Sequence, residues 1–193
     1  MQKTKPVLLI TAFIILCAIS GFILINKSQS SVFINPNSEN SQSVFSINSI
    51  IRFTDDFNGA NDTSALNARG YLLYFRGTGQ QGTSALWFQG EPSYFPAYNG
   101  PQDGYLASDF NTVTGQNNID NWLVLPVSSG GILFDDELFF YSKAEQDNPY
   151  ADSIRVMYSV SDSVPEGSWR ELGRYIRFLG TKGIQSHCTK QYR

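Results

Sequence analysis

The feature that most constrains this chain is an uncharged apolar run close to its N-terminus. Residues 7–25 read VLLITAFIILCAISGFILI, and no acidic or basic residue interrupts them. At about 20 residues, the run is long enough to cross a bilayer as one helix. Lys3 and Lys5 precede it, and a basic start followed by an apolar run is typical of an export signal. The sequence therefore predicts a signal-anchor or signal peptide over residues 1–25, with a transmembrane helix over residues 7–25.

The length of the run favours an uncleaved anchor, because a secretory apolar region is usually about 7–15 residues long. The small residues AIS (18–20), which precede Gly21, leave a cleaved signal as an alternative. Cys17 would suit a lipoprotein, but Leu16 stands where a small residue is expected, so a cysteine within an apolar helix is favoured. Positive residues tend to stay inside. The body is therefore expected outside the cytoplasm, periplasmic or at the cell surface, or secreted if the signal is cleaved.

The rest of the chain divides by composition. Residues 26–43, NKSQSSVFINPNSENSQS, are a Ser/Asn-rich linker that has too few apolar groups to offset the entropy of ordering. One domain of ordinary size is expected over residues 44–180. The basic tail, residues 181–193, is also poor in apolar residues and is predicted to be disordered, which would leave a sheet edge uncovered.

Charge and cysteine content exclude some classes of function. Residues 31–169 hold sixteen Asp or Glu against five Lys or Arg, whereas residues 170–193 hold six basic residues and one acidic residue. Because phosphate binding needs clustered basic residues, an acidic exported body is not expected to bind nucleic acid. Cys188 is the only cysteine besides Cys17, so no disulfide is expected within the exported domain.

Strand signals run through the body. Apolar or alternating segments occur at RGYLLYFRG (69–77), NWLVLPV (121–127), ELFFYSK (137–143) and SIRVMYSVS (153–161). Turn residues separate them, and no sustained helical period follows the N-terminal run. This pattern predicts an all-β body, built as an antiparallel sandwich or barrel.

Several motifs occur in the order of a known family. Residues 85–127, ALWFQGEPSYFPAYNGPQDGYLASDFNTVTGQNNIDNWLVLPV, resemble the choice-of-anchor J domain, which is related to the cleaved-adhesin domains of bacterial surface proteins. FFYSKAEQDNPYADSIRVMYSVSD (139–162) resembles the family's next two strands, and FTDDFN (53–58) fits its opening strand. The matching motifs are W-F-Q-G (87–90), F-P-A (95–97), the strand with Tyr105 and Asp109–Asn111, I-x-N-W-L-x-x-P (119–126), and the step Asp152, Ile154, Val156. The resemblance covers about residues 50–169.

This resemblance implies a jelly-roll β-sandwich of the galactose-binding-like kind, displayed on or beyond the cell envelope. It does not imply catalysis, since such a fold serves many functions. Members of the family continue with further strands beyond the position of Trp169. Here ELGRYIRFLG (171–180) offers one more strand, and the rest departs from the family pattern, as in a domain with a truncated or altered end.

Aromatic residues in WFQGEPSYFPAYNG (87–100) suggest a binding surface. Trp87 and Trp122 lie in strand-like positions and are expected in the core. Tyr94 and Tyr98 flank Pro96 in a turn-rich stretch, where exposed rings are expected. Because a flat ring stacks on the apolar face of a sugar, Tyr94 and Tyr98 are the candidate ligand-binding residues. A glycan or a surface protein is the expected partner.

Calcium is the cofactor that the acidic loops would suit, because it prefers oxygen ligands from Asp, Asn and backbone carbonyls. The candidate ligands are Asp55, Asp56, Asn58 and Asp62, in TDDFNGANDT. A second acidic cluster, FDDE (134–137), is explained equally well by an exposed turn.

Catalysis is not expected. His187 is the only histidine, and adjacent residues on an extended chain point to opposite sides, so a pair with Cys188 is not predicted. Gly77, Gly79 and Gly82 lack the Lys-Ser/Thr of a phosphate loop and suit turns. The expected function is a non-catalytic module for adhesion or carbohydrate binding. Two alternatives stay open, namely a glycan hydrolase that uses a carboxylate pair and a purely structural spacer domain.

Overall fold

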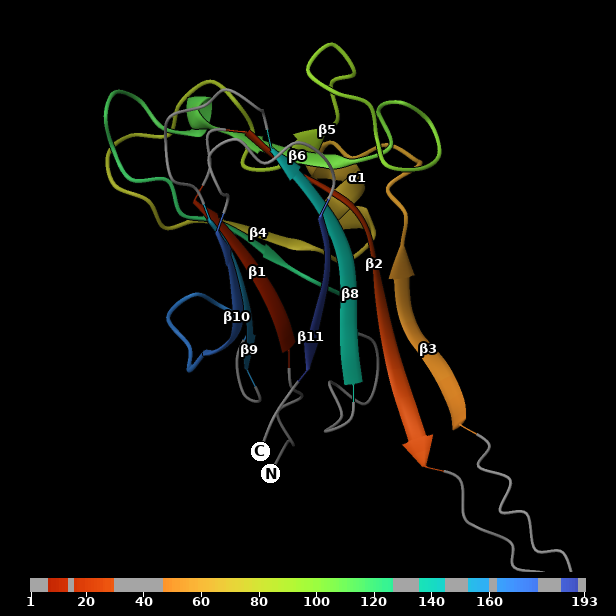
Figure 1. The fold of residues 1–193 in the computed structure, drawn as a ribbon. Coiled ribbons are helices and arrows are strands. Elements are labelled where there is room, and N and C mark those ends of the chain that lie inside the picture. The colour runs from red at the N-terminus through yellow and green to blue at the C-terminus, as the bar shows by residue number, and fades with distance from the viewer. Residues whose placement is uncertain are drawn as a thin grey trace, which may run out of the picture.

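Two antiparallel sheets form the framework of the described part of the protein. The computed structural model describes residues 7–13, 16–29, 47–126, 136–144, 153–159, 163–176 and 185–190. The first sheet has the order β10 (Arg170–Ile176), β9 (Ser153–Ser159), β1 (Val7–Phe13), β7 (Asn121–Val124), β4 (Leu72–Phe75). The second has the order β11 (Gln185–Lys190), β8 (Asp136–Ala144), β2 (Leu16–Gln29), β6 (Leu106–Asp109), β5 (Phe88–Gln89), and β3 (Ile47–Asp55) also pairs with β2 (Figure 1). The described residues are thus mainly strands, and the all-β prediction is confirmed.

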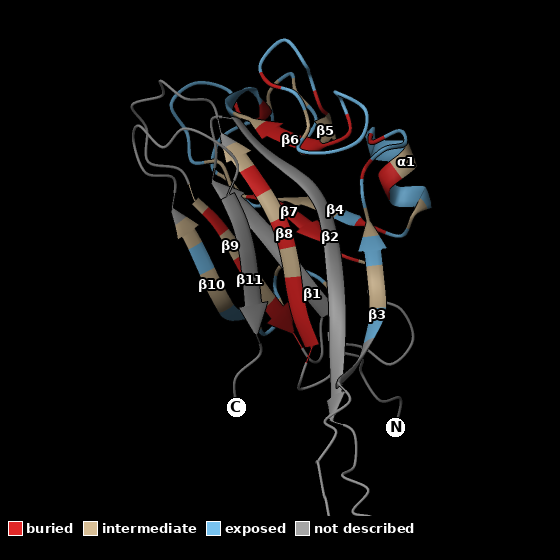
Figure 2. Ribbon diagram, turned by 45° about the vertical axis from the view of Figure 1, so that its right-hand side comes forward, coloured by how far each residue is buried: buried red, intermediate tan, exposed pale blue. Residues whose placement is uncertain are grey.

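The main core lies between the two sheets. Its buried members come from strands of both sheets, from the loops beside them and, for Leu66, from a short helix: Phe57, Leu66, Tyr71, Trp87, Leu106, Leu123, Leu125, Leu138, Phe140, Ile154, Val156 and Tyr158. Figure 2 shows buried residues concentrated in β6, β7, β8 and β9, whereas β3 is exposed or half-buried. In β9 the alternation read from the sequence holds, because Ile154, Val156 and Tyr158 are buried and their neighbours Arg155 and Met157 are half-buried. The two-residue alternation in the sequence therefore predicted correctly which face of β9 packs in the core.

The N-terminal run differs from its predicted conformation. The sequence predicts a membrane helix over residues 7–25, but the structure describes the strands β1 and β2 there. β1 pairs with β7 and β9, and β2 pairs with β3, β6 and β8. Among the described residues, no helix is both long and apolar enough to cross a membrane. The physical reason for the difference is that a continuous apolar run satisfies a buried strand as well as a helix, so periodicity cannot separate the two.

Both polar segments also differ from expectation. The linker predicted over residues 26–43 overlaps the end of β2, which continues to Gln29; residues 30–43 lie outside the described residues. In the tail that was predicted to be disordered, β11 pairs with β8 from Gln185↔Ser142 to Lys190↔Glu137 and so covers that edge. Strand pairing uses backbone groups, which every residue supplies, so an exposed edge can order a segment that has few apolar side chains.

One short helix was missed by the sequence analysis. α1 (Thr63–Ala68) begins at Asp62, whose carboxylate accepts hydrogen bonds from the backbone N–H groups of Ser64 (2.8 Å) and Ala65 (3.0 Å). An Asp at this position is a standard N-cap signal. With only six residues, however, the helix is too short to show a period.

Candidate functional site

The first candidate surface lies on the face of the second sheet that points away from the core. Along β6, Leu106 belongs to the main core, whereas Tyr105 and Ala107 on either side belong to a separate cluster with Phe95. Because successive side chains of a strand point to opposite faces, this second cluster lies outside the sandwich interior. The same alternation in β8 places Tyr141 opposite the core residue Phe140.

The loop over residues 91–104 covers part of this outer face. The ring of Phe95 stacks on that of Tyr105, with centroids 5.3 Å apart and planes at 26°. The hydroxyl of Tyr105 donates to the carbonyl of Glu91 and accepts from its N–H, at 2.8 Å in each case. Burial raises the pKa of Tyr105 above its ordinary value, although the hydrogen bond with Glu91 lowers it, so the hydroxyl remains a donor. The stacked ring of Phe95 and the hydroxyl of Tyr105 therefore hold the loop on the sheet.

Two tyrosines of this loop are exposed, as the sequence predicts. Tyr94 is 60% exposed and Tyr98 is 50% exposed. The ring of Tyr98 stacks on that of Tyr141, with centroids 4.2 Å apart and planes at 27°. A hydrogen bond with Tyr98 is the main reason that the pKa of Tyr141 is raised. Tyr98 and Tyr141 together are called the tyrosine pair below; the described ring contacts do not join Tyr94 to it.

Tyr141 was not among the residues singled out from the sequence. Its stretch ELFFYSK gives a signal, since alternation from a buried Phe140 would put Tyr141 on the opposite face. Lys143 lies two residues further along the same face, and its ammonium group sits 4.8 Å from the centre of the Phe95 ring. Tyr141 comes 43 positions after Tyr98 in the sequence, so the pair itself could not be predicted from neighbouring residues.

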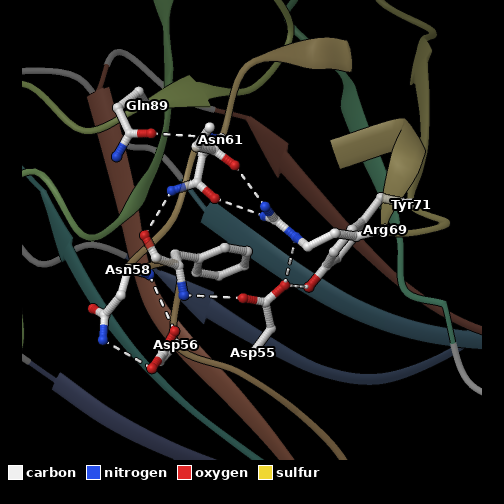
Figure 3. Close-up of polar contacts among 9 residues, drawn as sticks. Asp55, Asp56, Asn58, Asn61, Arg69, Tyr71 and Gln89 are labelled. Atoms are coloured by element: carbon white, nitrogen blue, oxygen red, sulfur yellow. Dashed lines mark hydrogen bonds and ion pairs between the residues drawn. The ribbon is translucent and has the colours of Figure 1, made fainter. Parts of the chain in front are cut away.

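Three of the residues predicted to bind calcium, Asp55, Asp56 and Asn58, lie at the end of β3 and in the loop that follows it (Figure 3). Asp55 accepts from the N–H of Phe57 (2.9 Å) and from the hydroxyl of Tyr71 (2.7 Å). Asp56 accepts from the N–H and the side-chain amide of Asn58, at 3.1 and 2.8 Å. Both carboxylates thus serve the fold of the loop, and calcium binding stays a prediction.

The other predicted ligands are placed differently. Asp62 caps α1, and the side-chain amide of Asn58 packs against Gly100 and Gly104 of the loop over residues 91–104. Across the part of the chain that the structure describes, no group of three or more His, Cys, Asp and Glu is placed to hold a metal ion. In FDDE, Asp136 is buried and its carboxylate forms an ion pair with Arg52 at 2.9 Å; Asp135 lies outside the described residues.

Arg69 ties this loop to the rest of the domain. Its guanidinium donates to the carbonyl of Ala60 (2.5 Å) and to the side chain of Asn61 (2.6 Å). Its Nε lies 3.1 Å from the carboxylate of Asp55, and this contact is an ion pair but not a hydrogen bond. The guanidinium also lies over the rings of Phe57 and Tyr71, at 5.9 and 5.7 Å from their centres.

The backbone of this loop is in an unusual conformation. Phe57 is fully buried with φ of 54°, a left-handed value that costs a non-glycine residue about 1 kcal/mol. Its N–H donates to Asp55, and its carbonyl accepts from the side-chain amide of Asn61 at 2.7 Å. Asn61 in turn is held by Gln89, whose side-chain oxygen accepts from the Asn61 N–H at 2.8 Å. These bonds fix the loop in one shape.

A pocket opens beside this network. Its volume is about 550 Å³, and it is lined by Phe53, Thr54, Asp55, Asp56, Arg69, Tyr71 and Pro126. It lies where the end of β3, the residues after α1 and the end of β7 meet. We call it the β3 pocket. Sequence reasoning marked Asp55 and Asp56 but had no signal for Arg69 and Tyr71, which come from another element.

No family model, no curated protein and no solved structure is significantly similar to the chain. Its function must therefore be argued from the two surfaces described above, the tyrosine pair and the β3 pocket.

Proposed function

We propose that this protein is a non-catalytic module for adhesion or carbohydrate binding at the cell surface, and that it binds a glycan on the tyrosine pair. The observation that carries the proposal is the stacking of two partly exposed rings, Tyr98 on Tyr141, 4.2 Å apart. Tyrosine combines a large apolar face with a polar hydroxyl, which suits a sugar whose faces are apolar and whose edge carries hydroxyls. The loop that carries Tyr98 is fixed by Phe95 and Tyr105, so little ordering entropy is lost on binding.

The proposed architecture is the jelly roll of the choice-of-anchor J and cleaved-adhesin type. The two antiparallel sheets with a shared core support it, as does the position of the motif residues, since Trp87 and Trp122 are both buried. A fold of this type gives no activity by itself. The proposal on function therefore depends on the tyrosine pair and not on the fold.

The proposed location is outside the cytoplasm, by way of the apolar run behind Lys3 and Lys5. A membrane helix over residues 7–25 and the strands β1 and β2 are alternative states of the same residues. A helix closes its backbone hydrogen bonds internally, whereas these strands close theirs with neighbouring strands. Protease added to intact spheroplasts should digest the body, and complete protection of the body would overturn the proposed location.

A glycan array tests the binding function directly. The wild-type chain should bind a subset of glycans, and Tyr98→Ala and Tyr141→Ala should each abolish that binding or weaken it at least about tenfold, the loss expected for one buried aromatic contact. Phe110→Ala is the matched control, because Phe110 is 54% exposed but lies in the short 3-10 helix Phe110–Thr112 that follows β6. Equal binding by all four chains would overturn the role of the tyrosine pair.

The same experiment separates the alternatives. Release of sugar from polysaccharide by the wild-type chain would favour a hydrolase with a carboxylate pair. Absence of both binding and hydrolysis would favour a structural spacer. Melting the protein in calcium and in chelator tests the predicted calcium site, because a ligand that binds the folded state raises the melting temperature.

A further inference from the structure

The β3 pocket has the composition of a binding site, independent of the tyrosine pair. Ligand pockets are typically about 300–1,000 Å³, and this one falls within that range at about 550 Å³. Its wall combines an aromatic ring, Phe53, and the ring of Pro126 with the polar groups of Thr54, Asp56 and Arg69. Apolar surface with a few convergent polar groups is the usual make-up of a small-molecule site.

The charges on the wall restrict what can bind. Asp55 and Asp56 are negative and Arg69 is positive, and all three line the same pocket. A simple anion meets two carboxylates, of which only Asp55 is paired with the guanidinium. A molecule that carries hydroxyls and no negative charge avoids this repulsion, because its hydroxyls can donate to a carboxylate and accept from the guanidinium.

The polar groups retain capacity for such a ligand. Each oxygen of Asp56 accepts one hydrogen bond from Asn58, and a carboxylate oxygen can accept two. The two terminal nitrogens of Arg69 each make one described hydrogen bond, to Ala60 and to Asn61, and each carries two N–H groups. The Arg69 side chain is 33% exposed, and Thr54 is exposed, so both are accessible to solvent.

The wall is also pre-organised. Asp55 is held by Phe57, Tyr71 and Arg69 (Figure 3). Burial, followed by the neighbouring charge of Asp55, raises the pKa of Tyr71 far above its ordinary range, so its hydroxyl stays a donor to Asp55. Because these side chains are already fixed, a ligand would order few groups on binding.

We propose that the β3 pocket binds a neutral, hydroxyl-rich ligand of the size of one sugar unit, with Phe53 and Pro126 against its apolar face and with Thr54, Asp56 and Arg69 on its hydroxyls. This site needs no contribution from Tyr98 or Tyr141 and stands apart from the function proposed above.

Amide chemical shifts of the full-length chain, measured during titration with D-glucose, D-galactose and D-mannose, test the proposal. At least one neutral sugar should shift the amides of residues 53–56, 69 and 71. Thr54→Val removes the hydroxyl of Thr54, and Asp56→Ala removes the carboxylate of Asp56. Each variant should bind the sugar about tenfold more weakly, because each loses one hydrogen bond to the ligand. Both replaced side chains are exposed, and the described hydrogen bonds of the Asp56 carboxylate reach only Asn58 in the same loop, so the overall fold should be retained. Asp103→Ala, which removes an exposed carboxylate from the loop over residues 91–104, should leave the affinity unchanged.

A negatively charged sugar provides the second arm. Glucuronate should bind more weakly than the neutral sugars, and tighter binding of glucuronate would overturn the charge argument. Shifts confined to the neighbourhood of Tyr94, Tyr98 and Tyr141 would overturn the pocket and support the tyrosine pair. Shifts at residues 53–56 that persist in Tyr98→Ala, together with an unchanged glycan array in that variant, would support the pocket and overturn the function proposed for the tyrosine pair. Absence of shifts with every sugar, or equal affinity in Thr54→Val and Asp56→Ala, would overturn the pocket.

Discussion

The second sheet carries aromatic residues on both faces, and the two faces use them in different ways. On the inner face, Trp87 and Phe140 are buried against the other sheet. On the outer face, Phe95 and Tyr105 are buried only because a loop covers them, and Tyr141 beside them is stacked with the half-exposed Tyr98. The residue types are alike, so the difference comes from what covers each face. The other sheet covers Trp87 and Phe140 on the inner face, whereas one loop covers only part of the outer face.

The outer face of the first sheet shows the opposite outcome. Trp122 is only 6% exposed, and Trp169 packs against it edge to face, with ring centres 5.6 Å apart. Trp169 is itself tied down, because its indole N–H donates to the carbonyl of Val164 at 2.9 Å. A segment of the chain can therefore bury an aromatic cluster on an outer face, as the segment with Trp169 does for Trp122. The partial exposure of the tyrosine pair is a specific property of its own loop.

The largest effect should come from removing β2, which lies between β6 and β8 and so supports both faces of the second sheet. Deleting residues 1–30 removes β1 as well, and the cooperative unfolding transition should be lost. Chemical denaturation followed by tryptophan fluorescence measures this. An unchanged transition in the shortened chain would show that the body does not need these strands, and it would favour a membrane helix over residues 7–25.

The next largest effect concerns the inner face. Trp87→Ala should lower the free energy of unfolding by about 3–5 kcal/mol, because it leaves a large cavity in the core. Urea denaturation monitored by circular dichroism measures the loss. A change below about 1 kcal/mol, which is typical of a surface position, would contradict the assignment of Trp87 to the inner face.

A smaller loss is expected on the outer face. Phe95→Ala removes the ring that stacks on Tyr105, and it should cost about 2–3 kcal/mol, less than a fully enclosed core position. Tyr98→Ala is the matched control in the same loop and should change stability by only about 0.5 kcal/mol, because its ring is half exposed. If the two variants lost the same free energy of unfolding, Tyr98 would hold the loop on the sheet as Phe95 does. The proposed difference between a buried anchoring ring and a half-exposed ring would then be wrong.

The smallest effect concerns Asp120, whose carboxylate accepts a hydrogen bond from Trp122 in the aromatic cluster of the first sheet. Burial raises the pKa of its carboxyl above the ordinary value of 3.8, although a hydrogen bond from the indole N–H of Trp122 and the charges of Arg155 and Arg76 lower it. The native state therefore holds the proton to higher pH than the unfolded chain does. The contribution of Asp120 to the free energy of unfolding falls as the pH rises from 3.8 through the raised pKa.

Asp120→Asn removes this titration and keeps an oxygen that can accept from Trp122. The variant should gain stability relative to wild type at neutral pH, and the gain should disappear below pH 3.8, where the aspartic acid is protonated in both states. Urea midpoints across this pH range measure the effect. A gain that is independent of pH would contradict the role assigned to burial.

Much of the strand pattern could be predicted from the sequence. The segments at 69–77, 121–127 and 153–161 contain β4, β7 and β9. The segment at 137–143 lies within β8, and the strand expected at 171–180 overlaps β10. Burial of Trp87 and exposure of Tyr94 were also predicted correctly. These features depend on neighbours along the chain, on alternation and on turn residues, which a sequence displays directly.

The candidate sites were only half predicted, because each needs residues from separate elements. Tyr98 was visible in the sequence, but its partner Tyr141 comes from β8. Asp55 was visible as a possible metal ligand, but Tyr71 and Arg69 draw its carboxylate into a network of the protein's own groups. The sequence does not show whether a carboxylate accepts hydrogen bonds from other residues of the protein or is available to a ligand.

The sequence by itself determined the alternation of the body strands, the turns between them and the apolar character of residues 7–25, because these follow from the order of side chains. Only the tertiary structure decided which face each aromatic residue occupies, what covers that face, and whether the apolar run pairs as strands. Those outcomes depend on which backbone edges and which covering loops are available nearby. Strand β2 illustrates the reason, since its hydrogen bonds are completed by β3, β6 and β8, which are encoded elsewhere in the chain.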